Sequence, residues 1–138
     1  MKQSKLKEKV NEVYLPMYGH SIYTVISTDL IKSRKKRYKI LGHDNDLDGY
    51  TGLFSSNGGH DGFIFLGPDA DAEVIAHEAF HAVCYIMNHI GTILCDESEE
   101  CFAYPLGYLV GSITKFIKSN KKYFKDHAKS KSSVSKQK

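Results

Sequence analysis

The stretch Ile75-Ala-His-Glu-Ala-Phe-His-Ala-Val83 decides how the rest of the chain is interpreted. Residues four apart lie on one face of an α-helix, so the imidazoles of His77 and His81 can reach a single cation. Glu78 is offset from them, where its carboxylate can reach a water molecule bound to that cation. The pattern predicts a metal-binding helix that carries a general base.

The residues around this motif favour a helix. Apolar side chains recur at helical spacing from Val74 to Ile90, and Gly91 is a typical residue just beyond a helix end. At the start, Asp69 or Asp71 can cap the first turn. The alternative interpretation is a surface or core helix whose histidines bind nothing.

The histidine pair points to zinc. Zinc accepts neutral imidazole nitrogen, prefers four ligands in a tetrahedron, and keeps one position for water in catalytic sites. A third protein ligand must therefore come from another part of the chain. Glu100 is the main candidate and Glu99 the alternative, although Asp96-Glu-Ser-Glu99 also fits a capping box, which would give Glu99 a structural role.

Eighteen residues separate His81 from Glu100, and this spacing resembles the Glu-type zincins, the class that includes thermolysin. The likeness is greater to the minimal members of that class and to small metallopeptidases encoded by phages and prophages. In those proteins a short strand precedes HExxH and a Glu-x-x-Ala-Tyr segment follows, here Glu100-Cys-Phe-Ala-Tyr104. The resemblance covers about residues 63 to 110, with a weaker likeness over residues 29 to 37.

Position by position, the resemblance implies that His77, His81 and Glu100 bind zinc while Glu78 is the general base. It also implies an α+β fold, a zincin-like minimal metallopeptidase domain with a small β-sheet packed on the motif helix and on a following helix that carries the third ligand. Four residues are candidates for the group that stabilises the transition state, and packing is the alternative role of each. They are Tyr85, His89, Tyr104 and Tyr108.

Stretches rich in β-branched and aromatic residues predict strands over Ser21–Ser27 and Asp61–Gly67, with Tyr50–Phe54 as a further candidate. The Asp61–Gly67 strand leads directly into the motif helix. Its free edge is therefore predicted to bind an extended peptide through main-chain hydrogen bonds.

Further helices are predicted over Lys5–Tyr14, from Thr28 or Asp29 to about Leu41, and over Asp96–Thr114. Pro105 lies inside the last of these and has no amide hydrogen to donate, so we expect a kink there or two shorter helices. The second helix presents six basic side chains, which either form a solvated face or contact phosphate; they are Lys32, Arg34, Lys35, Lys36, Arg37 and Lys39.

The segment Asp44-Asn-Asp-Leu-Asp-Gly49 matches the first half of an EF-hand calcium loop. Such a loop needs a bidentate glutamate at its twelfth position, where this chain has Ser55. The alternatives are a calcium site and an acidic loop between two elements, and the glycines that follow favour the loop.

Length and composition predict one globular domain over residues 1–126, followed by a Lys- and Ser-rich segment, 127–138, that we expect to be disordered. The net charge of +3 is uneven: nine lysines and one aspartate give +8 from Lys115 onward, so residues 1–114 carry −5. No apolar run is long enough to cross a membrane, and no secretion signal follows Met1. Cys84, Cys95 and Cys101 form no paired motif, which favours reduced packing residues and a cytoplasmic setting. Zinc ligation by these cysteines is the alternative, although their spacing does not suit a zinc finger.

The sequence thus supports three functions. The first is a zinc-dependent peptidase acting on a peptide or protein substrate, with His77, His81 and Glu100 on the metal and Glu78 as the base. The second is a zinc-binding interaction domain without turnover. The third is a binder of nucleic acid or of another anionic surface that uses the basic helix and the Lys-rich tail, and it predicts strong salt dependence.

Overall fold

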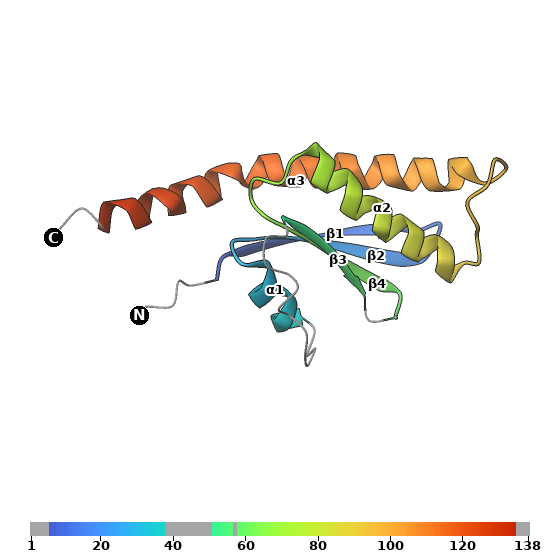
Figure 1. Cartoon of the computed structure of the whole chain (residues 1–138), viewed down its shortest axis with the longest axis horizontal. Coiled ribbons are helices and arrows are strands. Elements are labelled where there is room, and N and C mark those ends of the chain that lie inside the picture. The colour runs from blue at the N-terminus through green and yellow to red at the C-terminus, as the bar shows by residue number, and fades with distance from the viewer. Residues whose placement is uncertain (1–5, 38–50, 57, 135–138) are drawn as a thin grey trace.

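The computed structural model describes residues 6–37, 51–56 and 58–134, with side chains described as far as residue 126 (Figure 1). Its elements are β1 (Glu8–Leu15), β2 (His20–Ser27), α1 (Leu30–Arg37), β3 (Gly52–Ser56), β4 (Asp61–Leu66), α2 (Ala72–His89) and α3 (Glu99–Val134). The predicted α+β class is confirmed. Helices α2 and α3 cover one face of the sheet and α1 lies on the other.

The four strands form a mixed sheet in the order β1-β2-β4-β3. β1 and β2 are antiparallel with Leu15 opposite His20, β2 and β4 are parallel with Ser21 opposite Asp61, and β4 and β3 are antiparallel. The predicted strands over residues 21–27 and 61–67 are therefore confirmed, and the candidate strand at residues 50–54 corresponds to β3.

The prediction that the strand before the motif helix has a free edge is wrong. β4 pairs with β2 on one side and with β3 on the other, so its main-chain groups are used inside the sheet. Among the described strands, the edges of the sheet are β1 and β3. Any added peptide strand would have to pair with one of those two.

The helix predicted over Lys5–Tyr14 is also wrong, because this part of the chain forms strand β1. Val13 and Leu15 are buried on either side of exposed Tyr14, which is the two-residue alternation of a strand. A tight turn with Gly19 at φ 64° returns the chain to β2. Pairing along the whole of β2 outweighs the weak helical spacing of the apolar residues.

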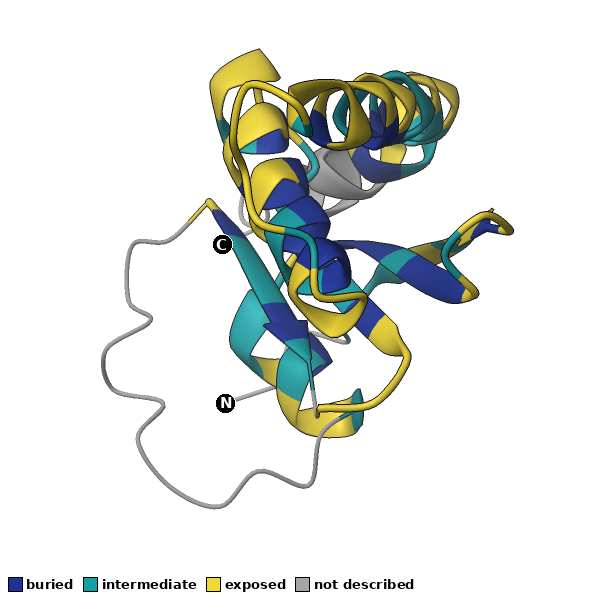
Figure 2. Cartoon of the chain, turned by 90° about the vertical axis from the view of Figure 1, so that its right-hand side faces the viewer, coloured by how far each residue is buried: buried dark blue, intermediate teal, exposed yellow. Residues whose placement is uncertain are grey.

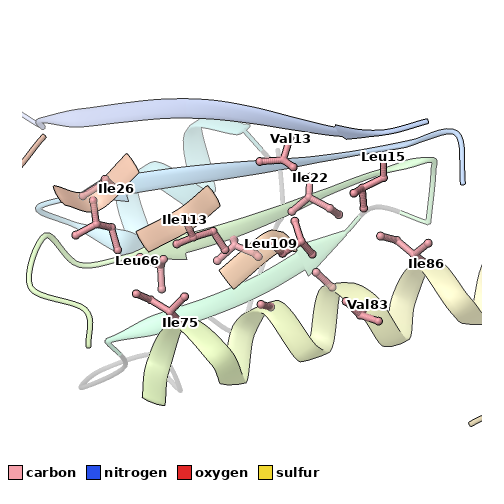
Figure 3. Close-up of a cluster of buried hydrophobic side chains, with 14 of the residues drawn as sticks. Val13, Leu15, Ile22, Ile26, Leu66, Ile75, Val83, Ile86, Leu109 and Ile113 are labelled. Carbon is pink, nitrogen blue, oxygen red and sulfur yellow. The ribbon is translucent and has the colours of Figure 1, made fainter. Parts of the chain in front are cut away.

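The main core lies between the sheet and helices α2 and α3 (Figure 3). Ile22, Ile26 and Leu66 point from the sheet towards the helices, where Ile86 and Leu109 meet them. Figure 2 shows that both helices turn their buried residues inward and leave their outer faces exposed. A smaller cluster around Val25 and Phe65 packs on the opposite face of the sheet, beside α1.

Helix α3 continues through Pro105 as one helix, so the expected alternative of two shorter helices is wrong. Proline cannot donate to the Cys101 carbonyl four residues earlier. Instead, the Tyr18 hydroxyl donates a hydrogen bond of 3.4 Å to that carbonyl. Burial raises the pKa of Tyr18, which keeps its hydroxyl protonated as a donor.

The remaining sequence predictions have mixed outcomes. Asp29 caps α1, since its Oδ1 accepts from the Lys32 amide at 2.9 Å. The predicted end of that helix near Leu41 and the calcium loop Asp44–Gly49 lie outside the described residues.

At the other end of the chain, α3 continues to Val134, into the segment that was expected to be disordered. In the described part of the chain, none of the helices has the length and apolarity needed to cross a membrane.

Candidate metal site

Helix α2 presents the HExxH motif as predicted. Asp71 is its N-cap, and its carboxylate accepts from the Val74 amide at 3.0 Å. Beyond the helix, Gly91 adopts φ 72°, a left-handed conformation that favours glycine. Ile75 and Ala79 face the core, so the exposed face of α2 carries the two histidines.

The structure brings the histidines of the motif together. The Nε2 atoms of His77 and His81 are 3.0 Å apart, and their ring centroids are 4.7 Å apart. Both residues are exposed. In the absence of a metal, this distance also suits a hydrogen bond between two neutral imidazoles, with one ring as the donor.

The distance between the two nitrogens is close to what a shared zinc ion requires. Two nitrogens bound at about 2.0–2.1 Å with a tetrahedral angle lie about 3.3 Å apart. The observed 3.0 Å differs from this by an amount that small rotations of the two rings can absorb. His77 and His81 therefore fit two of the four positions around zinc.

Glu78 lies beside the pair, but its side chain turns towards the sheet. It is only 7% exposed. Gly52, the first residue of β3, packs against it so closely that a Cβ at this position would lie 2.9 Å from Glu78 Cγ. The edge strand β3 therefore packs directly on the Glu78 side chain.

The structure does not bring Glu100 or Glu99 to the histidine pair. Both glutamates are exposed in the first turn of α3. Across the described residues, no group of three or more His, Cys, Asp or Glu side chains is placed so that it could hold a metal ion. The role of Glu100 as a ligand stays a prediction.

Helix packing accounts for the position of Glu100. Spacings of four residues place Glu100, Tyr104 and Tyr108 on one side of α3. Tyr104 and Tyr108 line a surface pocket of about 380 Å³ together with Tyr14 and Tyr18 of the β1–β2 hairpin. This side of α3 therefore faces the hairpin rather than α2.

The connection before α3 differs from the expected capping box. Helix α3 begins at Glu99, and the turn before it is organised by Ser98. The Ser98 hydroxyl accepts from the Cys95 amide at 3.0 Å and donates to the Ile93 carbonyl at 2.5 Å. Asp96 lies in this turn, outside the helix that it was expected to cap.

The tyrosines and the histidine considered as transition-state donors occupy two different places. Tyr104 and Tyr108 belong to the pocket beside the hairpin. Tyr85 donates a short hydrogen bond to the Gly59 carbonyl, and the His89 ring packs on Tyr85 with centroids 4.3 Å apart. These last two lie at the C-terminal half of α2, next to the β3–β4 turn.

The three cysteines are free thiols, but only Cys84 packs against the core, so the packing role predicted for Cys95 and Cys101 is wrong. Burial raises the pKa of the Cys84 thiol on α2. Since a metal ligand must be the thiolate, this shift disfavours Cys84 as a ligand. Cys95 and Cys101 are exposed near the start of α3.

Part of the basic face of α1 is engaged in ion pairs. Arg37 donates to Glu8 Oε2 at 2.9 Å, and Lys36 reaches the other oxygen of the same carboxylate. Lys32 pairs with Asp29 within the first turn at 3.3 Å. These contacts support the interpretation of this helix as a solvated face with local pairing rather than as a phosphate-binding surface.

The structure also assembles a histidine cluster that no sequence spacing indicates. His20 begins β2, His60 precedes β4 and His89 ends α2, yet their rings lie beside one another. Sequence reasoning missed His20 and His60 because they meet only when β2 and β4 pair. Their alignment follows from the parallel register in which Ser21 lies opposite Asp61.

Comparison with known proteins gives no match: no protein-family model, curated protein or solved structure matches this chain.

Proposed function

We propose that this chain is a zinc-dependent peptidase with a minimal zincin-like architecture. The observation that carries the proposal is the 3.0 Å separation of the His77 and His81 Nε2 atoms on the exposed face of α2, with Glu78 next to them in the chain. A helix that places two imidazole nitrogens at this distance suits a shared zinc ion.

Zinc at this position would lower the pKa of its bound water to about 7 and polarise the scissile carbonyl. Glu78 would accept the proton of that water and later deliver it to the leaving amine. Its side chain starts from a buried position against Gly52, so it would have to rotate towards the His77 and His81 rings to act on that water.

Glu100 is the third ligand that the resemblance implies, and Glu99 is its alternative. Both lie in the first turn of α3, which follows α2 after the connection 90–98. For either carboxylate to reach the histidine pair, this turn would have to shift towards α2. The metal affinities of single variants distinguish the two glutamates.

A peptide substrate would be held by strand β3, since β3 is the sheet edge that packs on α2. The Thr51 carbonyl accepts from the Gly67 amide, so residue 51 and alternate residues after it face β4. By the same alternation, Gly52, Phe54 and Ser56 turn their main-chain groups away from β4, where an extended peptide can pair with them.

Zinc content and chelator-sensitive hydrolysis of a peptide library, measured on the full chain, test this proposal. We expect Glu78→Gln to keep its zinc and lose hydrolysis, because it removes the base and leaves the ligands. His81→Ala should lose both. Glu73→Gln, an exposed change on the same helix, is the matched control and should retain both.

Full hydrolysis by Glu78→Gln would reject this mechanism. Zinc binding that survives in His77→Ala and in His81→Ala would reject the site. If the wild-type chain binds zinc at the pair but cleaves no peptide, the chain is instead a zinc-binding interaction domain.

A further inference from the structure

The outer face of α3 beside the β1–β2 hairpin is apolar and exposed. Tyr104 is 75% exposed and Tyr108 is 58% exposed, and both line the surface pocket of about 380 Å³ that also includes Pro105 and Met17. Met17, in the turn of the hairpin, is itself 87% exposed. Large apolar side chains that gather on a surface in this way mark an interaction site more often than scattered ones do.

The charges of α3 lie at the two ends of this face and have opposite signs. Residues 101–114 contain no Asp, Glu, Lys or Arg, although the outer side of a surface helix is usually charged. Glu99 and Glu100 precede this stretch, and Lys115 and Lys118 follow it. All four of these side chains are exposed.

Two glycines leave room beside the tyrosines. An added Cβ at Gly107 or at Gly111 would meet no atom of the described residues within 4 Å, so open space lies over both positions. Glycine inside a helix is unfavourable for the helix itself, but it allows the backbone of another helix to approach closely. The face therefore combines projecting aromatic rings with hollows that can receive them.

These features are complementary to themselves when a second copy of α3 lies antiparallel to the first. Three pairs of residues share one midpoint, between residues 107 and 108: Glu100 with Lys115, Tyr104 with Gly111, and Gly107 with Tyr108. Helical spacing keeps these six residues on one side of α3. In a two-fold dimer each pair occurs twice, so every tyrosine ring would meet a glycine and every glutamate a lysine.

Charge favours this orientation over a parallel one. Two parallel helices would place Glu100 beside the same residue of the second copy, and Lys115 likewise, so that like charges repel. In the part of the chain that the structure describes, neither Glu100 nor Lys115 has an ion-pair partner. Both side chains are therefore available to a second copy.

We propose that the chain forms an antiparallel two-fold homodimer through the outer face of α3 between Glu100 and Lys115. The contact would extend about 22 Å along the helix. It uses no residue of α2, so it does not rest on zinc at the His77–His81 pair. Glu100 is also the zinc ligand that the resemblance implies, and the dimer is therefore tested in the presence of EDTA, which removes the metal.

Sedimentation equilibrium of the full chain tests the proposal. We expect a mass that approaches twice the 15.6 kDa of the chain between about 1 and 100 μM. Glu100→Lys and Lys115→Glu each create two pairs of like charges, so each should weaken dimerisation by at least about tenfold. An equal mixture of the two variants should dimerise like wild type, because both pairs of the mixed dimer then have opposite charges.

Glu73→Lys is the matched control, since Glu73 is an exposed glutamate in the first turn of α2, as Glu100 is in α3. It should dimerise like wild type. Tyr104→Ser, which removes the ring opposite Gly111, should weaken dimerisation by at least about tenfold. The substituted residues are exposed, so each variant should keep cooperative thermal unfolding.

A wild-type chain that stays monomeric up to about 100 μM overturns the proposal. A dimer that Glu100→Lys and Lys115→Glu do not weaken overturns it as well. The same holds if both single variants are folded monomers and their mixture does not dimerise, because antiparallel pairing of residues 100 and 115 requires that rescue.

Discussion

Glu8 is the residue that ties the first strand to the first helix. Its two carboxylate oxygens accept hydrogen bonds from Arg37, Lys36 and Ser33 of α1. Burial of the carboxylate raises its pKa, but these hydrogen bonds outweigh that effect and lower the pKa to about 2. The ionised form is therefore the one that the folded chain stabilises.

A pH-dependent loss of stability follows from this pKa. Glu8 favours the folded state fully above its ordinary pKa of 4.5, and this contribution is lost as the pH falls towards about 2. At pH 7, Glu8→Gln should lower the free energy of unfolding by about 1.5–3 kcal/mol. Urea unfolding at pH 7 and near pH 2 checks this, since the difference between wild type and variant should shrink at the lower pH.

Glu73→Gln is the control for this experiment, because Glu73 is exposed on α2. Its effect should stay within about 0.5 kcal/mol at both pH values. A Glu8→Gln chain that matches wild type at pH 7 would show that the contacts with α1 contribute nothing to stability.

At the residue scale, the sequence was informative where function depends on spacing within one element. His77 and His81 meet as predicted because the geometry of a helix alone determines the separation of residues four apart. Glu100 does not meet them, because its direction depends on how α3 packs on α2 and on the β1–β2 hairpin. Spacing along the chain carries no information about that packing.

At the scale of elements, the contact between β3 and α2 depends on the absence of a side chain at Gly52. A Cβ there would lie 2.5 Å from Val74 Cγ1 and 3.1 Å from Leu66 Cδ2. Gly52→Ala should therefore destabilise the chain by about 1–3 kcal/mol, measured by urea or thermal unfolding. On α3, a Cβ added at Gly107 would have no atom within 4 Å, so Gly107→Ala should instead stabilise the helix by about 0.5–1 kcal/mol. Equal effects of the two changes would contradict this account of the interface.

Helix α3 and the β1–β2 hairpin are coupled through Pro105 and Tyr18. The carbonyl of Cys101 lacks an amide donor because of Pro105, and the Tyr18 hydroxyl serves it instead. Tyr18→Phe should cost about 0.5–1.5 kcal/mol in the wild-type chain. In a Pro105→Ala background, where residue 105 regains its amide, the same change should cost less. A double-mutant cycle by thermal unfolding measures the coupling, and strictly additive effects would refute it.

The elements that the sequence predicted correctly carry strong local signals. α2 has an N-cap, a long apolar stripe and a glycine beyond its end, while β2 and β4 are rich in β-branched and aromatic residues. β1 was missed because its apolar residues are few and fit helical spacing as well as strand alternation. Only its pairing with β2, which involves residues distant in sequence, decides between the two.

At the scale of the whole molecule, the basic C-terminal region has two parts. Residues 115–126 of α3 contribute side chains to the core, and residues 127–138 follow them. Ile117 and Phe124 are buried against the rest of the protein. Removing residues 115–138 should therefore abolish cooperative unfolding, since these two core side chains are lost. Removing only residues 127–138 should leave the midpoint of thermal unfolding within a few degrees of wild type. An intact fold after the longer deletion would show that this part of α3 is not needed for the core.

The shorter deletion also tests whether the chain binds anionic surfaces. Four of the nine lysines from Lys115 onward lie beyond residue 126. If the tail binds nucleic acid, the affinity of the full chain should fall steeply between 50 and 200 mM salt and drop further on deletion. The deletion from residue 115 is unsuitable for this purpose, because it also removes part of the core.

The overall architecture could be predicted only as a class. The resemblance to the Glu-type zincins implied an α+β fold, but the strand order β1-β2-β4-β3 was not predicted. Which strands occupy the edges decides where a peptide can pair, and this depends on contacts between segments tens of residues apart. For this reason a free edge was expected on β4, which instead lies inside the sheet.

The parallel pairing of β2 with β4 has a consequence for synthesis on the ribosome. Ser21 must meet Asp61, forty residues later, so the centre of the sheet cannot close until β4 has left the exit tunnel. The β1–β2 hairpin, whose partners are close in sequence, can form long before that. The apolar face of this hairpin stays exposed on the nascent chain until α2 and α3 have been synthesised and can cover it.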